Sequence, residues 1–165
     1  MIKNLFRKEK LKYFELDKYD IGKAELDFWK TIDVKSGKKR LIVRVRIEKP
    51  TIPDIAQYSK CISIIWDYQP NEANLPCIED RNRHEEFERV LDDLTMYNNL
   101  SFLMGVSNGM GMKEWAFYSK DTDEFMVLFN ERTSILPKLP VKIHFYDDPE
   151  WEIWKEKLKF HEKGN

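Results

Sequence analysis

Apolar and polar residues alternate most regularly between Arg40 and Lys49. One set of alternate positions is wholly apolar and comprises Leu41, Val43, Val45 and Ile47. The other set is mostly charged and comprises Ile42, Arg44, Arg46 and Glu48. This period of two predicts a strand with one buried and one solvated face. Because residues 25–33 also suit a strand and the segment between them contains Gly37, we predict a β-hairpin from Glu25 to Glu48.

The segment from Lys60 to Tyr68 is apolar on both faces, which is typical of an interior strand. A helix is predicted from Asp80, because apolar residues after it recur at helical spacing. These residues are Phe87, Val90, Leu91 and Leu94. Two strand-like runs, 99–107 and 113–120, then flank a Gly-rich segment, so we predict a second hairpin.

A second helix and a last strand are predicted further along the chain. Asp121 or Thr122 suits the N-cap of this helix, and Pro137 and Pro140 mark its end. Its packing face is predicted to consist of Phe125, Leu128, Phe129 and Arg132. The alternation of apolar and polar residues over 140–146 then predicts a half-buried strand.

The elements from Ser59 to Tyr146 follow the order strand, helix, strand, strand, helix, strand. This is the order of the ferredoxin-like, split βαβ arrangement, in which both helices lie on one face of an antiparallel sheet. We therefore predict an α+β fold, with the N-terminal hairpin extending the sheet or folding beside it and a C-terminal helix closing one end. Residues 24–165 are expected to form one domain after a charged arm or helix at residues 1–23. A single dry interior is expected to contain Phe87, Trp115, Ile143 and Trp151.

The segment from Tyr146 to Lys157 combines adjacent acids with two tryptophans, which invites a catalytic or metal-binding interpretation. However, Asp148 suits a helix N-cap, Pro149 the first helical position and Glu150 the positive end of the helix. An apolar stripe at helical spacing follows, made of Trp151, Trp154 and Leu158. Asp147 and Asp148 should diverge as neighbours at a strand end, and no other ligand is spaced to complete a metal shell. We therefore predict a helix start and no metal site.

Composition limits the partners and the location of the chain. With 28 basic and 29 acidic residues, the net charge of the 165-residue chain is -1, so no overall field draws it to nucleic acid or an anionic membrane. No apolar run approaches the length that a membrane-spanning helix needs. Cys61 and Cys77 fit neither a disulfide framework nor a zinc site, which favours a reducing cytoplasm.

The three histidines, His84, His144 and His161, have no Cys or Asp companion at catalytic or ligand spacing. We predict that all three are surface side chains. The Gly-rich segment 108–111 lacks the Lys and the Ser or Thr of a phosphate-binding loop, and we interpret it as a hairpin turn. The sequence therefore predicts no catalytic residue and no cofactor.

The densest basic patch lies on the first hairpin and comprises Lys38, Lys39, Arg40, Arg44 and Arg46. Lys39, Arg44 and Arg46 are the candidate nucleic-acid-binding residues, since such a face can hold phosphates while aromatic neighbours stack on bases. The alternative is a solvated strand face, because Asp33 and Glu48 lie among these residues and basic side chains on an edge strand also oppose aggregation.

Three motifs carry a resemblance to a known family: LPCIEDRNRHEEFERVLDDL (75–94), GMKEWAFYSKD (111–121) and IHFYDDPEWEIW (143–154). Over about residues 24–158 the chain resembles the bacterial domain-of-unknown-function family numbered six-nine-five. Where that family often has Gly-Pro before the first helix, this chain has Leu75 and Pro76. The family has no established activity, and it is similar in fold to the regulator of ribonuclease E activity B, a ferredoxin-like inhibitory binding protein.

The resemblance and the lack of a catalytic constellation favour a cytoplasmic, non-enzymatic module that binds another protein and inhibits or regulates it. Trp29, Trp66 and the loop 69–76 are candidate contact surfaces, since aromatic residues dominate interface energies. The alternatives are RNA binding through the basic hairpin and an enzyme with a carboxylate between the sheet and the last helix. An exposed sheet face or edge is also compatible with a dimer.

Overall fold

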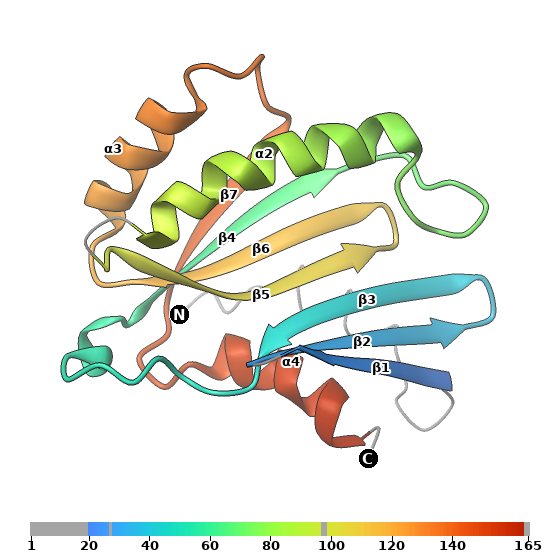
Figure 1. Cartoon of the computed structure of the whole chain (residues 1–165), viewed down its shortest axis with the longest axis horizontal. Helices are drawn as coiled ribbons and strands as arrows, with labels where there is room; N and C mark the ends of the chain where they lie inside the picture. The colour runs from blue at the N-terminus through green and yellow to red at the C-terminus, as the bar shows by residue number, and fades with distance from the viewer. Residues whose placement is uncertain (1–19, 27, 97–98, 164–165) are drawn as a thin grey trace.

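The computed structural model describes residues 20–26, 28–96 and 99–163 of the chain. Over these residues, seven antiparallel strands form one sheet of order β1-β2-β3-β5-β6-β4-β7 (Figure 1). The strands are β1 (Asp20–Leu26), β2 (Trp29–Ser36), β3 (Lys39–Arg46), β4 (Lys60–Asp67), β5 (Ser101–Gly109), β6 (Met112–Ser119) and β7 (Val141–Asp147). The helices are α2 (Ile78–Met96), α3 (Thr122–Thr133) and α4 (Glu152–Lys163), with a short 3-10 helix η2 (Ile55–Gln57) before β4. The predicted α+β class is confirmed.

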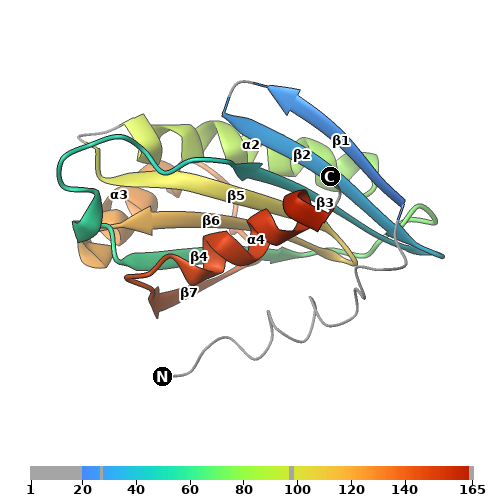
Figure 2. The ribbon, with the colours of Figure 1, turned by 90° about the horizontal axis from the view of Figure 1, so that it is seen from below.

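Helices α2 and α3 cover one face of the sheet, and α4 lies on the opposite face (Figures 1 and 2). We call these the α2–α3 face and the α4 face. The element order β4-α2-β5-β6-α3-β7 is the predicted one, and its four strands lie in the order β7-β4-β6-β5. Strand β4 pairs with β6 on one side and β7 on the other and is buried along most of its length, so the predicted interior strand is confirmed.

The N-terminal hairpin extends the sheet, which is one of the two arrangements predicted. Strands β2 and β3 pair along their full lengths, and the turn between them contains Gly37 with a positive φ of 57°. Strand β3 also pairs with β5, so the hairpin continues the sheet sideways beyond the area that α2 covers (Figure 1). The basic residues of β3 are therefore held on a regular, paired strand.

The single strand predicted over residues 25–33 is wrong. The structure ends β1 at Leu26 and starts β2 at Trp29, and Phe28 between them is exposed. Part of β1 also falls within the arm or helix predicted for residues 1–23, because this strand begins at Asp20. Residues 1–19 lie outside the described part of the chain, so the prediction for them stays a prediction.

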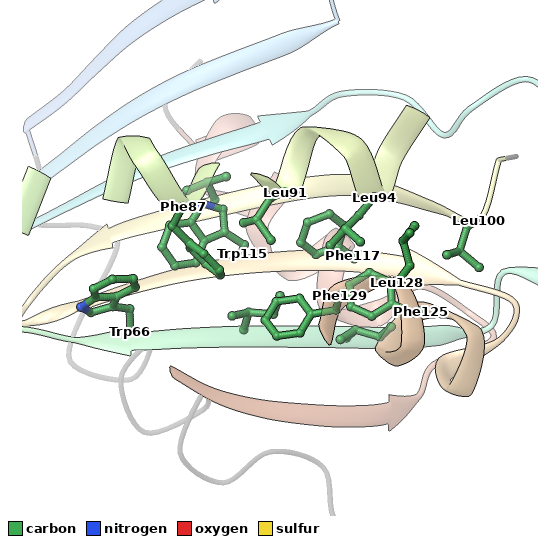
Figure 3. Packing of buried hydrophobic residues seen from close by; sticks show 13 residues of the cluster. Trp66, Phe87, Leu91, Leu94, Leu100, Trp115, Phe117, Phe125, Leu128 and Phe129 are labelled. Atoms are coloured by element: carbon green, nitrogen blue, oxygen red, sulfur yellow. The ribbon is translucent and has the colours of Figure 1, made fainter. Parts of the chain in front are cut away.

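The α2–α3 face is packed mainly by aromatic and aliphatic side chains (Figure 3). Its fully buried residues include Trp66, Phe87, Leu94, Trp115, Phe117 and Phe125. The rings of Phe87 and Trp115 meet edge to face with centroids 5.1 Å apart, a favourable geometry for aromatic pairs. The helical repeats that predicted α2 and α3 thus point into this layer, although Val90 and Arg132 are only partly buried.

The α4 face has a separate core. Its buried residues include Ile32, Val43, Val45, Met104, Tyr118, Trp151 and Trp154. The prediction that Trp151 shares one interior with Phe87 and Trp115 is therefore wrong, because the sheet lies between them. A sheet covered on both faces necessarily divides its apolar side chains into two layers.

Candidate functional site

The acidic segment before α4 is a capping structure, as predicted, but with a different geometry. The carboxylate of Asp148 accepts hydrogen bonds from the backbone amides of Glu152 (2.8 Å) and Ile153 (2.9 Å). These amides lie in the first turn of α4, which has no intrahelical partners for them. Pro149 precedes the helix, so the prediction that it occupies the first helical position is wrong. Trp151, with a φ of 58°, joins this turn to the helix.

Tyr118 ties the capping carboxylate to the sheet. Its hydroxyl donates to Asp148 Oδ2 (2.6 Å) and accepts from the amide of Trp154 (3.1 Å). Its ring stacks on Trp151 with centroids 4.0 Å apart. Burial raises the pKa of Tyr118, so the phenol stays protonated and keeps donating. Asp148 is thus held as a structural acceptor.

Asp147 diverges from Asp148, as expected for neighbours at a strand end. Its exposed carboxylate forms an ion pair with Lys60 of β4. Among the described residues, no group of three or more His, Cys, Asp or Glu side chains is placed to hold a metal ion. The two aspartates therefore have different structural partners.

A buried ion pair that no sequence pattern indicated lies beneath α4. Lys157 Nζ contacts Glu114 Oε2 at 3.1 Å, and their side chains are 4% and 3% exposed. Lys157 also donates to the hydroxyl of Ser107, while Ser63 donates to Glu114 Oε1 at 2.5 Å. The network joins α4 to the central strands β4, β5 and β6.

Gly105 makes room for this network. A Cβ atom at Gly105 would lie 2.6 Å from the Lys157 side chain, closer than real Cβ contacts. Glu114 occupies the place that the enzyme alternative assigned to a carboxylate, between the sheet and the last helix. Both of its oxygens accept hydrogen bonds from the protein, an arrangement that favours a structural role.

His84 is buried at 1% exposure, so its prediction as a surface side chain is wrong. It lies on α2 among the rings of Trp66, Tyr68 and Trp115, with centroids 4.9 to 5.9 Å away. Neither ring nitrogen has a hydrogen-bond partner among the described residues. Burial, aided by the positive charge of Lys113, lowers the pKa of His84 to about 4, so the imidazole is neutral near pH 7.

The other two histidines differ in what the structure shows. His144 is exposed on β7, as predicted. The side chain of His161 lies outside the described part of the structure. Trp66, a predicted contact residue, is 2% exposed and belongs to the aromatic core, so it offers a partner no surface.

The basic hairpin presents fewer cationic side chains that could contact a phosphate than the sequence suggested. Arg40 forms two hydrogen bonds with the carboxylate of Asp33, at 2.9 and 2.7 Å, and these bonds lower the pKa of that carboxyl group. Arg44 is exposed and its guanidinium lies 4.9 Å from the ring centroid of Trp29. The three candidates are thus spread along one strand: Lys39 is exposed, Arg44 covers an indole and Arg46 is half-buried.

Strand β7 forms one edge of the sheet, and its only strand partner among the described residues is β4. The amide of Asp148 donates to the carbonyl of Ser59, its opposite residue in the β4–β7 register. Because hydrogen-bonded pairs alternate in an antiparallel ladder, the backbone groups of Ile143 and Phe145 point away from β4. Phe145 is also 48% exposed. The edge therefore combines available backbone groups with an apolar side chain.

No helix in the described part of the chain is long and apolar enough to cross a membrane.

Comparison with known proteins adds a family but no activity. Neither the curated proteins nor the solved structures contain a match, so the resemblance to the regulator of ribonuclease E activity B stays a prediction. A family model described as "Family of unknown function (DUF695)" matches residues 27–159. The chain belongs to this family.

Proposed function

We propose that this chain is a non-enzymatic, protein-binding module that regulates its partner through the edge strand β7. The observation that carries the proposal is the β7 edge, which has no second strand partner among the described residues and where outward backbone groups at Ile143 and Phe145 accompany an exposed phenylalanine ring. A partner segment that adds a strand there gains main-chain hydrogen bonds and an apolar contact with the exposed phenylalanine ring. Natural edge strands are usually blocked against such pairing.

The rest of the molecule supports binding over catalysis. The buried polar groups of the α4 face, Glu114, Lys157 and Asp148, are engaged with one another or with the backbone. A catalytic group needs an unsatisfied reactive atom that a substrate can reach. Cys61 and Cys77 are compatible with the reducing cytoplasm that we propose as its location.

Capture from native lysate tests the proposal when three baits are compared. The wild-type chain is immobilised beside Phe145→Lys and Val127→Lys, which both exchange an exposed apolar residue for a cation, at the β7 edge and on the outer side of α3. We expect one stoichiometric protein on the wild type and on Val127→Lys, and its loss on Phe145→Lys. A protein retained equally by all three baits, or no stoichiometric protein at all, contradicts the regulation of a different protein through β7.

RNA binding is a second candidate function, and the Arg44–Trp29 pair favours it. The exposed guanidinium of Arg44, held by the indole beneath it, can contact a phosphate or present its plane to a stacked base. The test is fluorescence anisotropy with single-stranded RNA across a salt series, using Arg44→Glu and, as a matched control, Arg89→Glu on the exposed side of α2. Affinity that falls steeply with salt and only with Arg44→Glu supports this candidate, whereas salt-insensitive or absent binding removes it.

A further inference from the structure

We infer that the β7 edge binds a second copy of this chain, as an antiparallel β7–β7 pair centred on His144. This inference rests on the proposed function and names the partner of the same edge. It follows from the directions of the backbone groups, from the faces on which the side chains lie and from the midpoint of the strand.

The backbone directions limit how two copies can pair. In each copy the residues with odd numbers from Val141 to Asp147 have outward N–H and C=O groups, because Asp148 and the other even-numbered residues bond to β4. An antiparallel pair therefore places odd residues opposite odd residues as hydrogen-bonded pairs. A two-fold axis perpendicular to the sheet satisfies this condition and keeps each face of the sheet on its own side.

The register follows from the length of β7. His144 is the midpoint of Val141–Asp147, so a two-fold axis at His144 pairs all seven residues of the strand with residues of the second strand. An axis at Ile143 or Phe145 leaves two residues of each strand opposite the turns that flank β7. The register centred on His144 thus forms the most hydrogen bonds.

Two symmetry-related side-chain pairs in this register are apolar. Ile143 of one copy lies opposite Phe145 of the other, on the face where Ile143 already packs against the aromatic core. Phe145, which is half exposed in a single copy, then gains an apolar cross-strand neighbour twice in each dimer. At the centre, each His144 faces its own counterpart as a non-hydrogen-bonded pair, with Cα atoms about 4.5 Å apart.

Disulfide trapping tests the register. The variant His144→Cys, made in a Cys77→Ser background, places two thiols within the Cα range that a disulfide requires. The matched control is Lys142→Cys, which lies opposite Tyr146 of the second copy and far from its own counterpart. We expect mild oxidation to link His144→Cys chains into a dimer and to leave Lys142→Cys chains mostly monomeric. A dimer that links through residue 142 and not through 144 overturns the inferred register.

Sedimentation of the purified chain over a concentration series tests the pairing itself. We expect a dimer for the wild type and for Val127→Lys, and at least a tenfold weaker association for Phe145→Lys, which puts a cation opposite Ile143 and close to its symmetry mate. Circular dichroism checks that each variant is folded. A monomeric wild type, or a Phe145→Lys variant that dimerises as well as the wild type, overturns self-association.

The two proposals fail separately. If the purified wild type is monomeric but lysate capture yields a protein that Phe145→Lys loses, the edge binds another protein and only the self-pairing is wrong. If the purified chain dimerises through β7 and lysate capture yields no other protein, self-pairing stands and the regulation of a different partner is wrong.

Discussion

The two faces of the sheet are built by different means, although the same central strands serve both. On the α2–α3 face, β4 and β6 direct Trp66, Trp115 and Phe117 into a layer dominated by aromatic rings. On the α4 face, neighbouring residues of the same strands contribute Ser63, Glu114 and Tyr118 to hydrogen-bonded networks that hold one helix. Packing that depends on volume tolerates some rearrangement, whereas a buried polar network depends on every partner being present. The two layers should therefore respond differently to substitution.

The largest expected effect is loss of volume on the α2–α3 face. Trp115→Ala removes a fully buried indole that packs on Phe87 and donates to Glu88 at 2.9 Å. Large-to-small substitutions of this kind leave a cavity, and we expect a loss of about 4 kcal/mol in the free energy of unfolding. Urea unfolding followed by fluorescence measures it. Trp115→Phe is the matched control and should lose less than half as much, so equal losses would argue against cavity formation as the cause.

Breaking the ion pair on the α4 face should cost nearly as much, but in a way that a second substitution reverses. Lys157→Met removes the cation that lies 3.1 Å from the buried Glu114 carboxylate, and we expect a loss of about 3 kcal/mol. Adding Glu114→Leu removes the stranded charge and should restore most of the stability. A double-mutant cycle by urea unfolding measures the coupling between the two residues. Additive losses would show that the pair does not act as a unit.

The sequence predicted the elements well where a regular repeat sets the environment of each side chain. Alternation between Arg40 and Lys49 located β3, and the repeat of Phe87, Leu91 and Leu94 located the buried side of α2. The division of 25–33 into two strands was missed because residues 27 and 28 include neither Gly nor Pro, and Phe28 favours a strand by its chemistry. Local propensity does not determine where a chain reverses when the turn lacks a distinctive residue.

The candidate site was less predictable for two physical reasons. His84 was predicted to be a surface residue and Lys157 was assigned no role. Yet His84 lies three residues before Phe87 and Lys157 three residues after Trp154, each on the buried side of its helix. Helical spacing was a usable signal, and the chemical type of the residue outweighed it. Strand register decides two further features: that Glu114 meets Lys157, and that some backbone groups of β7 point outward. A periodic pattern of apolar residues does not determine this register.

A smaller effect should distinguish the hydrogen bonds of two buried tyrosines on opposite faces. Tyr118→Phe removes a donor to the carboxylate of Asp148 and an acceptor for Trp154, and we expect a loss of about 2 kcal/mol. Tyr68→Phe removes a bond to the neutral amide oxygen of Asn108 (2.9 Å) and should lose about 1 kcal/mol. Urea midpoints compare the two variants directly. A larger loss for Tyr68→Phe would contradict the greater dependence of the α4 face on charged acceptors.

The smallest expected effect is a pH dependence of stability that His84 causes on the α2–α3 face. The pKa of His84 is about 4 in the folded chain against 6.5 for an unperturbed imidazole, because burial and Lys113 disfavour the cation more than Asp80 and Glu88 favour it. The unfolded chain binds the proton more readily than the folded chain. The contribution of neutral His84 to the free energy of unfolding is therefore fully present above pH 6.5 and is lost as the pH falls towards 4. Between pH 7 and 5.5 we expect this group to lower the free energy of unfolding by about 1 kcal/mol.

One histidine variant isolates this contribution. His84→Leu keeps an apolar side chain in the aromatic layer and should be about 1 kcal/mol less sensitive than the wild type to the change from pH 7 to 5.5, by urea unfolding. If His84→Leu loses as much stability as the wild type over this interval, the folded chain accommodates a charged His84. The aromatic layer would then admit a hydrated cation beside Trp66 and Trp115, and the contrast between a layer that depends on volume and one that depends on polar partners would not hold.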